Sequence, residues 1–214
     1  IWQGGVDGNW ETPGNWEAGT CNDSGGSASY PATNDVTAKF DGSEADTGDA
    51  GRTITINNNI ALGQIIFSTG SNNQNWTFTG SDLTKTITFD GTKSQSVRMN
   101  NSNISITFNI NVTVDRSNQT QMVLGDSGTR TNNNITFGTL YTLSLTKPVK
   151  FKYNSKTQSV VFNGNITASS NTGDLIFDDY HGATFGTTVG MSNFPASLLF
   201  QGLVVSGTTT YGDT

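Results

Sequence analysis

The feature that most constrains the fold of this chain is a succession of short alternating segments from Thr53 onward. Each segment has three to eight residues, alternates apolar with polar side chains and ends at Gly, Asn or Asp, as in TITINNNI, NWTFTG, KTITFDG and NNITFG. Alternation with a period of two is typical of strands with one buried face. Because no window holds a sustained period of 3.6 residues, we expect an all-β fold with almost no helix.

Phenylalanines recur along these segments at intervals of about 19 to 25 residues. The set comprises Phe67, Phe89 and Phe108, then Phe137 and Phe162, then Phe177 and Phe200. Such intervals fit one coil of a solenoid that has three short strands joined by three corners. Stacked coils would place Phe, Ile and Val in interior columns and Thr and Asn in outward, hydrogen-bonded ladders. We therefore predict a right-handed parallel β-helix, that is, a β-solenoid.

An antiparallel β-sandwich of the jelly-roll type is the alternative, since many short strands also suit two packed sheets. Two observations favour the solenoid. From Thr53 onward only Pro148 and Pro195 occur, each between two strand segments, where a corner is expected. The only Asn-Gly dipeptide is Asn163-Gly164, whereas a fold rich in hairpins tends to have several.

The first 52 residues form a different region, which is aperiodic and rich in tryptophan and turn residues. The exposed end of a solenoid has an apolar interior and strand edges that need a cover. Large rings suit this role, because each buries roughly 150–250 Å². We expect residues 1–52 to cap the coils formed by residues 53–214. The expected cap residues are Trp2, Trp10, Trp16, Tyr30 and Phe40.

A different role for Trp10 and Trp16 is also open. Exposed tryptophans beside Gly and Asn stack on sugar rings in carbohydrate-binding modules, so the same residues suit a surface that binds polysaccharide. Burial distinguishes the two hypotheses, since a cap needs enclosed rings and a platform needs exposed ones.

The N-terminal segment IWQGGVDGNWETPGNWEAG, followed by Pro31, Asp35-Val36 and Phe40, resembles the N-terminal module of bacterial proteins with autotransporter-associated β-strand repeats. The C-terminal GTTTYGDT is similar to the Gly-Thr-Thr-Tyr element of that repeat. The matching positions are Trp2, Gly4, Gly5, Gly8, Trp10, Asn15, Trp16, Gly19, Pro31, Asp35, Val36 and Phe40. The resemblance implies an extracellular or surface-exposed right-handed β-helix, structural or adhesive, with no cofactor and no catalytic site. Repeated Gly-x-Gly-x-Leu units and a C-terminal membrane barrel are not found in this sequence.

Charge argues against nucleic acid as a partner. The 214 residues have a net charge of −6, with 11 basic residues that are scattered rather than clustered. In KPVKFKYNSK, at 147–156, alternation places Lys150 and Lys152 on one strand face and Phe151 and Tyr153 on the other, which indicates a solvated face. The chain has no apolar run long enough to span a bilayer, so we expect no membrane insertion.

Other features of composition suit an exported bacterial protein. Cys21 is the single cysteine, so no intrachain disulfide staples the fold. The chain begins at Ile1, as expected of a product from which a signal peptide has been removed. Low charge and abundant Thr and Asn point the same way, to an extracellular or cell-surface location. In a bacterial product, most Asn-x-Ser/Thr sequences are expected to carry no glycan. In this chain such sequences begin at Asn22, Asn75, Asn100, Asn103, Asn111, Asn118, Asn134 and Asn165.

Two acidic segments are candidates for chemistry. FDDYHG contains Asp178, Asp179 and the only histidine, His181. Adjacent strand residues point to opposite faces, so the two carboxylates would not share one substrate, and we interpret the segment as a polar corner. We therefore expect no catalytic site. The loop residues Asp41, Glu44, Asp46 and Asp49 have oxygen ligands spaced for calcium, but they do not match the EF-hand pattern, and a solvated acidic loop is the simpler interpretation.

The C-terminal LVVSGTTTYGDT is a β-prone run with one charged residue, Asp213. An uncovered β edge is a template for another chain, so residues 203–214 are a candidate strand between subunits. The residues expected to self-associate are Leu203, Val204, Val205, Thr209 and Tyr211. A contact of this kind that does not close on itself builds a filament. The sequence thus predicts a non-enzymatic, self-associating structural or adhesive protein, with a carbohydrate-binding module as the alternative.

Overall fold

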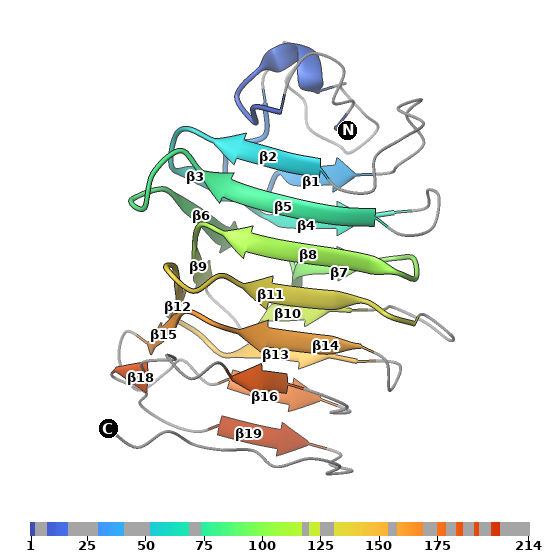
Figure 1. The fold of residues 1–214 in the computed structure, drawn as a ribbon, viewed down its shortest axis with the longest axis vertical. Coiled ribbons are helices and arrows are strands. Elements are labelled where there is room, and N and C mark those ends of the chain that lie inside the picture. Colours follow the sequence, from blue (N-terminus) through green and yellow to red (C-terminus); the bar gives the residue numbers. More distant parts are fainter. Residues whose placement is uncertain are drawn as a thin grey trace.

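A computed structural model gives the fold of the chain (Figure 1). It describes residues 1–2, 8–16, 30–40, 52–68, 74–116, 120–124, 131–153, 158–168, 175–178, 183–185, 191–192 and 198–201. Within these residues the only helix is the 3₁₀ turn η1 (Pro13–Asn15), and the rest of the regular structure is β-strand. The predicted all-β composition is confirmed.

The strands form three sheets, each named here after its first strand. The β1 sheet contains β1 (Thr37–Phe40), β4 (Gln64–Phe67), β7 (Gln95–Met99), β10 (Thr120–Val123), β13 (Val149–Lys152), β16 (Leu175–Asp178) and β19 (Leu198–Gln201). The β2 sheet contains β2 (Arg52–Ile56), β5 (Gln74–Gly80), β8 (Ile104–Asn109), β11 (Asn134–Phe137), β14 (Ser159–Phe162) and β17 (Ala183–Phe185). The β3 sheet contains β3 (Ile60–Leu62), β6 (Thr86–Gly91), β9 (Asn111–Arg116), β12 (Thr142–Leu145), β15 (Asn165–Ala168) and β18 (Met191–Ser192).

The chain visits the three sheets in turn, so that each strand pairs with the strand three places further along the sequence. Every pairing between these strands is parallel, with β2 beside β5, β5 beside β8 and β8 beside β11. In Figure 1 the coils lie one above another, from the N-terminal segment at the top to β19 at the bottom. This arrangement is a three-sided parallel β-solenoid, and it rules out the antiparallel sandwich.

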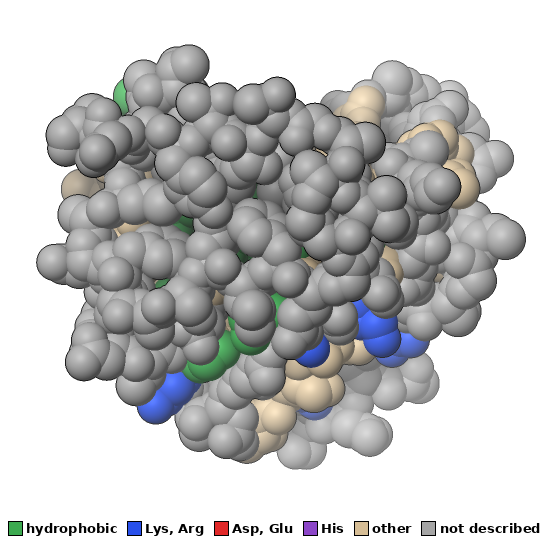
Figure 2. All heavy atoms as spheres, turned by 90° about the horizontal axis from the view of Figure 1, so that it is seen from below, with side chains coloured by type: hydrophobic (Ala, Val, Ile, Leu, Met, Phe, Trp, Pro, Cys, Tyr) green, Lys and Arg blue, Asp and Glu red, His purple; other side chains and the backbone are tan. Residues whose placement is uncertain are grey.

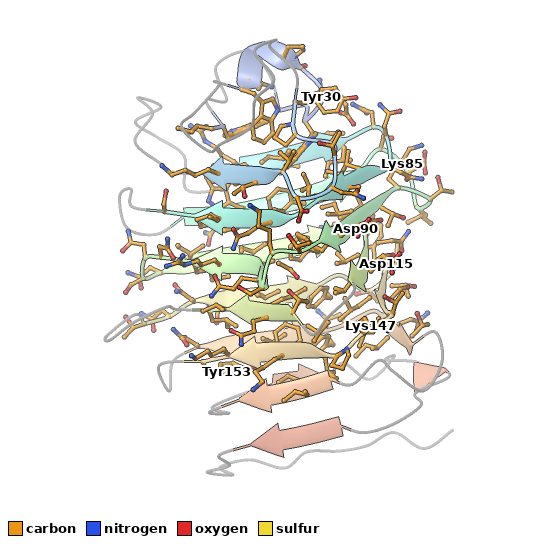
Figure 3. The ribbon with its side chains drawn as sticks, turned by 180° about the vertical axis from the view of Figure 1, so that it is seen from behind. Tyr30, Lys85, Asp90, Asp115, Lys147 and Tyr153 are labelled. Atoms are coloured by element: carbon orange, nitrogen blue, oxygen red, sulfur yellow. The ribbon has the colours of Figure 1, made fainter. Side chains whose placement is uncertain are left out.

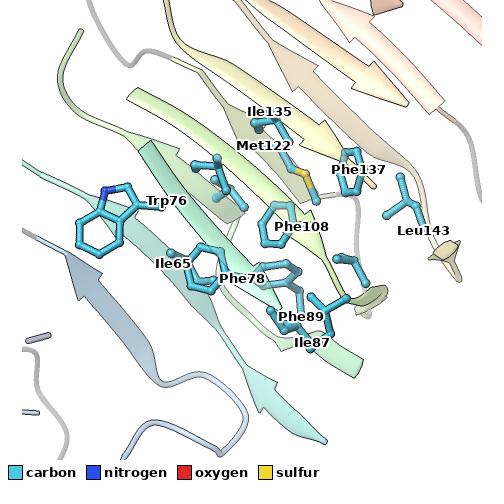
Figure 4. Close-up of a cluster of buried hydrophobic side chains, with 14 of the residues drawn as sticks. Ile65, Trp76, Phe78, Ile87, Phe89, Phe108, Met122, Ile135, Phe137 and Leu143 are labelled. Atoms are coloured by element: carbon cyan, nitrogen blue, oxygen red, sulfur yellow. The ribbon is translucent and has the colours of Figure 1, made fainter. Parts of the chain in front are cut away.

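Stacked phenylalanines fill the interior behind the β2 sheet. Phe78, Phe108, Phe137 and Phe162 are register partners on successive strands. Their ring centroids are 5.5, 5.6 and 5.2 Å apart, and neighbouring planes are within 22° of parallel. Figure 4 shows three of these rings in succession among Ile and Leu side chains. The offset stacking of aromatic rings adds to the burial of their apolar area, so the column ties each coil to the next.

The coil length agrees with the spacing in the sequence in the C-terminal half and exceeds it before that. Phe137 and Phe162, and Phe177 and Phe200, are register partners on successive coils, 25 and 23 residues apart. Phe67, Phe89 and Phe108 do not form a column, because they lie in the β1, β3 and β2 sheets respectively. In that part of the chain the repeats run from Phe78 to Phe108 and from Phe108 to Phe137, and they have 30 and 29 residues. Phenylalanine faces the interior from all three sheets, so the linear spacing mixed different sheets.

Two neighbouring columns follow the β1 sheet, and each contains a pair of stacked rings. Phe40 stacks on Phe67 at 5.2 Å in one column, and Phe151 stacks on Phe177 at 5.5 Å in the other. The register of β7 and β10 shifts at Gln121/Met122, which leaves one extra residue in β7. This residue, Ser96, is buried, and its hydroxyl is 2.8 Å from that of Thr120. The hydrogen bond removes the cost of burying two hydroxyl groups at the bulge.

Asparagines form one corner of the stack. Asn103 and Asn132, on successive coils, have φ of 59° and 58°, a left-handed conformation that Asn tolerates well. The amide of Asn132 donates a hydrogen bond to Oδ1 of Asn103 at 2.8 Å. Beside them, Asn133 is buried; its Oδ1 accepts from the N–H of Ile104, and its Nδ2 donates to the carbonyls of Asn101 and Leu124. The abundance of Asn therefore has a structural explanation at this corner.

Candidate functional site

The end of the stack that begins with β1, β2 and β3, here called the leading end, carries a cluster of three tryptophans. Trp2, Trp10 and Trp16 have exposed fractions of only 4%, 0% and 8%. The centroid of the Trp16 ring is 5.0 Å from that of Trp2 and 4.6 Å from that of Trp10, both in edge-to-face geometry. All three rings also contact Phe40, at centroid distances of 5.9 to 6.2 Å. The indoles thus continue the apolar interior beyond the first coil.

Hydrogen bonds fix two of these indoles. Nε1 of Trp10 donates to the carbonyl of Pro31 at 2.8 Å, and Nε1 of Trp16 donates to the carbonyl of Trp10 at 2.6 Å. The short turn η1 reverses the chain between them, with Pro13 at its start and the amide of the buried Asn15 donating to the carbonyl of Asn9. Because a buried indole N–H needs a partner, these bonds determine where each ring can lie.

The same segment also pairs with the first strands of two sheets. The N–H of Trp2 donates to the carbonyl of Lys39 on β1 at 2.8 Å. On β2, the N–H of Thr55 donates to the carbonyl of Gly8, and its carbonyl accepts from the N–H of Trp10, both at 2.8 Å. A Cβ on Gly8 would lie 2.9 Å from the carbonyl oxygen of Thr53, so glycine suits this close approach. These backbone N–H and C=O groups would otherwise form an open edge, and they are hydrogen-bonded within the chain instead.

Glu11 attaches the segment to the corner after β2. Its Oε1 accepts hydrogen bonds from the N–H groups of Asn57 and Asn58, at 2.8 and 2.9 Å, and its Oε2 accepts from the amide of Asn57 at 3.1 Å. A carboxylate is the strongest acceptor available to backbone N–H groups, so this contact binds the leading end more firmly than a neutral side chain would.

Asp35 connects the entry to β1 with the loop between β6 and β7, two coils further along. It adopts φ of 65°, and its Oδ1 accepts from the N–H of Thr92 at 2.5 Å and from the Thr92 hydroxyl at 3.2 Å. The N–H of Thr92 is the main cause that lowers the pKa of Asp35, and the hydroxyl of Thr92 and the charge of Lys93 lower it further. Gly91, with φ of 102°, leaves room for this carboxylate.

These observations locate the expected cap residues. Trp2, Trp10 and Trp16 are buried, and the partly buried Tyr30 packs against the hydrophobic core. Phe40 lies in β1, and its ring is the first member of a column, so the strands of the solenoid begin before the boundary that we expected at residue 52. Buried indoles do not present a face on which a sugar ring can stack, so the geometry does not support the platform hypothesis.

Several other predicted residues lie outside the described part of the chain. They are the calcium candidates Asp41, Glu44, Asp46 and Asp49, the self-association residues Leu203, Val204, Val205, Thr209 and Tyr211, and also Cys21, Asp179 and His181. Asp178 ends β16. No group of three or more potential metal ligands occurs among the described residues. Calcium binding therefore stays a prediction, and addition of a chelator tests it by a fall in the melting temperature.

The face expected to be solvated is found as predicted. Phe151 and Tyr153 are buried, whereas Lys150 and Lys152 point outward from β13 and are half-buried. Lys39 on β1 and Arg98 on β7 occupy outward positions of the same sheet. In Figure 2, which views the trailing end of the stack, the visible Lys and Arg side chains lie toward one side of the molecule. Of the Asn-x-Ser/Thr matches, Asn75 and Asn165 are exposed.

Sequence reasoning missed Glu11 and the contacts of Asp35. Glu11 has no periodic or motif signal, since its partners are 46 and 47 residues away. Asp35 had one signal, its place in the Asp-Val-x-x-x-Phe element of the resemblance, but that element does not indicate Thr92 as its partner. Nothing in the sequence distinguishes the buried Asn133 from the many other asparagines.

The fold and its leading end define a class of protein, the parallel β-solenoid with an aromatic cluster at one end. Comparison with protein-family models, curated proteins and solved structures finds no match. Within the described residues, no helix has the length and apolar character needed to cross a bilayer.

Proposed function

We propose that the chain is a non-enzymatic, extracellular structural or adhesive β-solenoid of bacterial origin, and that copies of it join head to tail. The observation that supports the proposal is the cluster of three buried indoles at the leading end. There the chain's own N-terminal segment occupies backbone groups of Lys39 and Thr55 and places three indoles over the interior. In this proposal the segment acts as a cap, as terminal repeats do in other solenoids.

The stacked interior supports a structural role. Columns of like residues run from coil to coil in fixed register, so the stack resists bending and local opening along its whole length. A solenoid grows by adding coils, and its stability is approximately the sum of coil and interface contributions. A rod of this kind suits a layer, fibre or surface stalk better than it suits a mobile binding module.

The trailing end, formed by β17, β18 and β19, is where the proposal places the joint. Residues 203–214 supply the joining strand, with Leu203, Val204, Val205, Thr209 and Tyr211 as its contacts. A contact between unlike ends does not close on itself and so produces a filament. The backbone groups of Thr55 and Lys39 at the leading end are already hydrogen-bonded within the chain, so a joining strand from another copy attaches beside them and not to them.

Electron microscopy of the purified chain over a range of concentrations tests this proposal. The full chain is expected to form rods that lengthen with concentration, and a variant that ends at residue 202 is expected to remain as single particles with an unchanged melting temperature. Single particles at every concentration, or equal polymerisation of the shortened variant, would contradict it. The carbohydrate-binding alternative predicts monomers that a polysaccharide column retains.

A further inference from the structure

The outward face of the β2 sheet carries threonines in register. On successive strands, a first column contains Thr53, Thr77, Thr107 and Thr136, and a second contains Thr55, Thr79 and Asn109. The two columns are two residues apart along each strand, so β2 and β5 each present a Thr-x-Thr pair. Parallel pairing fixes this array, because neighbouring strands match residue for residue.

The hydroxyls of the first column have no partner within the described part of the chain. Thr53, Thr77, Thr107 and Thr136 make no side-chain hydrogen bond to another described residue, although all are at least partly exposed. On the β3 sheet the hydroxyl of Ser144 is instead bonded to that of Thr167 at 3.0 Å, and the hydroxyl of Thr146 donates to the carbonyl of Val114. Hydrogen bonds of the kind that we expected between outward register partners join Ser144 to Thr167 on the β3 sheet and Ser159 to Asn134 on the β2 sheet, and none involves the first threonine column. The hydroxyls of that column are available to an outside partner.

The face is also uncharged. The outward positions of β2, β5, β8 and β11 hold only Thr, Ser and Asn, and Arg52, at the start of β2, lies over the ring of Trp76 instead. The β1 sheet has Lys39, Arg98, Lys150 and Lys152 at outward positions. Along the β3 sheet and its corners, Figure 3 shows Lys85, Asp90, Asp115 and Lys147 down one side of the stack. In a chain of net charge −6, a neutral face matches a neutral partner.

Strand geometry gives the array two repeat lengths. Adjacent strands are about 4.7–4.9 Å apart, and two residues along a strand span about 6.4–6.8 Å. Each threonine hydroxyl both donates and accepts hydrogen bonds, and the branched side chain has a restricted χ1, so little conformational freedom is lost on binding. Hexagonal ice has a prism face on which oxygens repeat at two comparable lengths, and each oxygen there both donates and accepts hydrogen bonds.

We propose that the two outward columns of the β2 sheet, the first of threonines and the second of Thr55, Thr79 and Asn109, form a binding face for ice. In this inference the hydroxyls of Thr53, Thr77, Thr107 and Thr136 hold water molecules at positions close to those of the crystal, and the methyl groups exclude disordered water between them. The inference is independent of head-to-tail association, because the face lies on the side of the stack and not at its ends.

Ice-affinity partition and measurement of the gap between the melting and freezing points test the proposal on the full chain. The test variant carries Thr77→Lys and Thr107→Lys at the centre of the first column. The matched control carries Thr88→Lys and Thr113→Lys, which are outward register partners on the β3 sheet. Circular dichroism and the melting temperature establish that both variants keep the fold.

The wild-type chain is expected to enter growing ice and to hold back its growth. The test variant is expected to lose the effect by roughly tenfold or more, since the lost contacts are central to the face, and the control is expected to keep it. No uptake of the wild-type chain into ice would overturn the proposal, as would equal losses in both variants. Retention on cellulose or chitin without ice binding, lost only in the test variant, would assign the face to a neutral polysaccharide and would also overturn it.

Discussion

The indole N–H of Trp16 donates a hydrogen bond to the backbone carbonyl of Trp10 at 2.6 Å, while the two rings meet edge to face with their centroids 4.6 Å apart. This pair packs the described residues around Trp10 and Trp16 against one another. Trp10 is the fully buried member, and its ring also contacts Phe78, 6.3 Å away in the column of the β2 sheet. The leading end and the coils should therefore unfold together.

Replacement of Trp10 by alanine tests this coupling. Trp10→Ala removes a fully buried ring and is expected to lower the free energy of unfolding by about 3–5 kcal/mol. Leu140→Ala is the control, because Leu140 is 72% exposed and its loss should change stability by less than about 0.5 kcal/mol. Urea denaturation followed by circular dichroism gives both values. Similar stabilities for the two variants would show that the indoles do not support the first coil.

Glu11 should behave as an anchor whose effect depends on Asn57. Glu11→Gln replaces the carboxylate that accepts from Asn57 and Asn58, and a loss of about 0.5–1.5 kcal/mol is expected, because the contact is exposed and Gln keeps one acceptor oxygen. A double-mutant cycle with Asn57→Ala isolates the shared contact, since Nδ2 of Asn57 donates to Oε2 of Glu11. Purely additive effects of the two substitutions would contradict the contact.

Asp35 should contribute to stability in a pH-dependent way. The pKa of its carboxyl is lowered in the folded chain, first by the N–H of Thr92. Because the pKa is lower in the folded chain, the ionised carboxylate stabilises the fold at pH values above the unfolded pKa of about 3.9. This stabilisation is lost as the pH falls through the pKa of the folded chain. Asp35→Asn tolerates the positive φ but lacks the charge, so melting temperature plotted against pH should become flatter below about pH 4. An acid limb as steep as that of the wild-type chain would argue against this role.

The buried corner asparagine should be much less tolerant than its exposed neighbour. Asn133→Asp replaces the Nδ2 that donates to the carbonyls of Asn101 and Leu124, and it leaves two acceptors facing a carboxyl oxygen. A loss of about 3 kcal/mol is expected. Asn132→Asp, at the exposed position one residue earlier, should cost less than about 1 kcal/mol. Thermal denaturation of the two variants at neutral pH compares them, and equal losses would be inconsistent with the buried hydrogen bonds.

The sequence predicts the class of fold because its signal is local. Alternation within segments such as those around Phe78 and Phe108 reports a buried face directly, and sparse Pro and Asn-Gly favour stacked coils over hairpins. The spacing identified only some of the column partners. Phe137 and Phe162 are register partners, as are Phe177 and Phe200, whereas Phe67, Phe89 and Phe108 each lie in a different sheet. Loops of unequal length between the strands make the coil length vary, so spacing alone does not define the register.

The leading end was foreseen only in outline. Tryptophan content indicates that rings are available for burial, and Trp2, Trp10 and Trp16 are buried. The contacts that hold the segment join residues 46 to 57 positions apart, such as Glu11 with Asn57 and Asp35 with Thr92. No local pattern encodes such pairs, since they arise only after the coils have brought distant corners together.

The register of neighbouring coils underlies the columns, the covered end and the threonine face alike, and thiol crosslinking measures it most directly. With Cys21 replaced by serine, cysteines are placed at the register partners Thr107 and Thr136, or at Thr107 and Thr113 as a mismatched pair. A short bifunctional thiosulfonate should link the first pair within one chain almost completely and leave the second pair unlinked. Failure to link Thr107→Cys with Thr136→Cys in the folded chain, or equal linkage of the mismatched pair, would contradict the stacked solenoid.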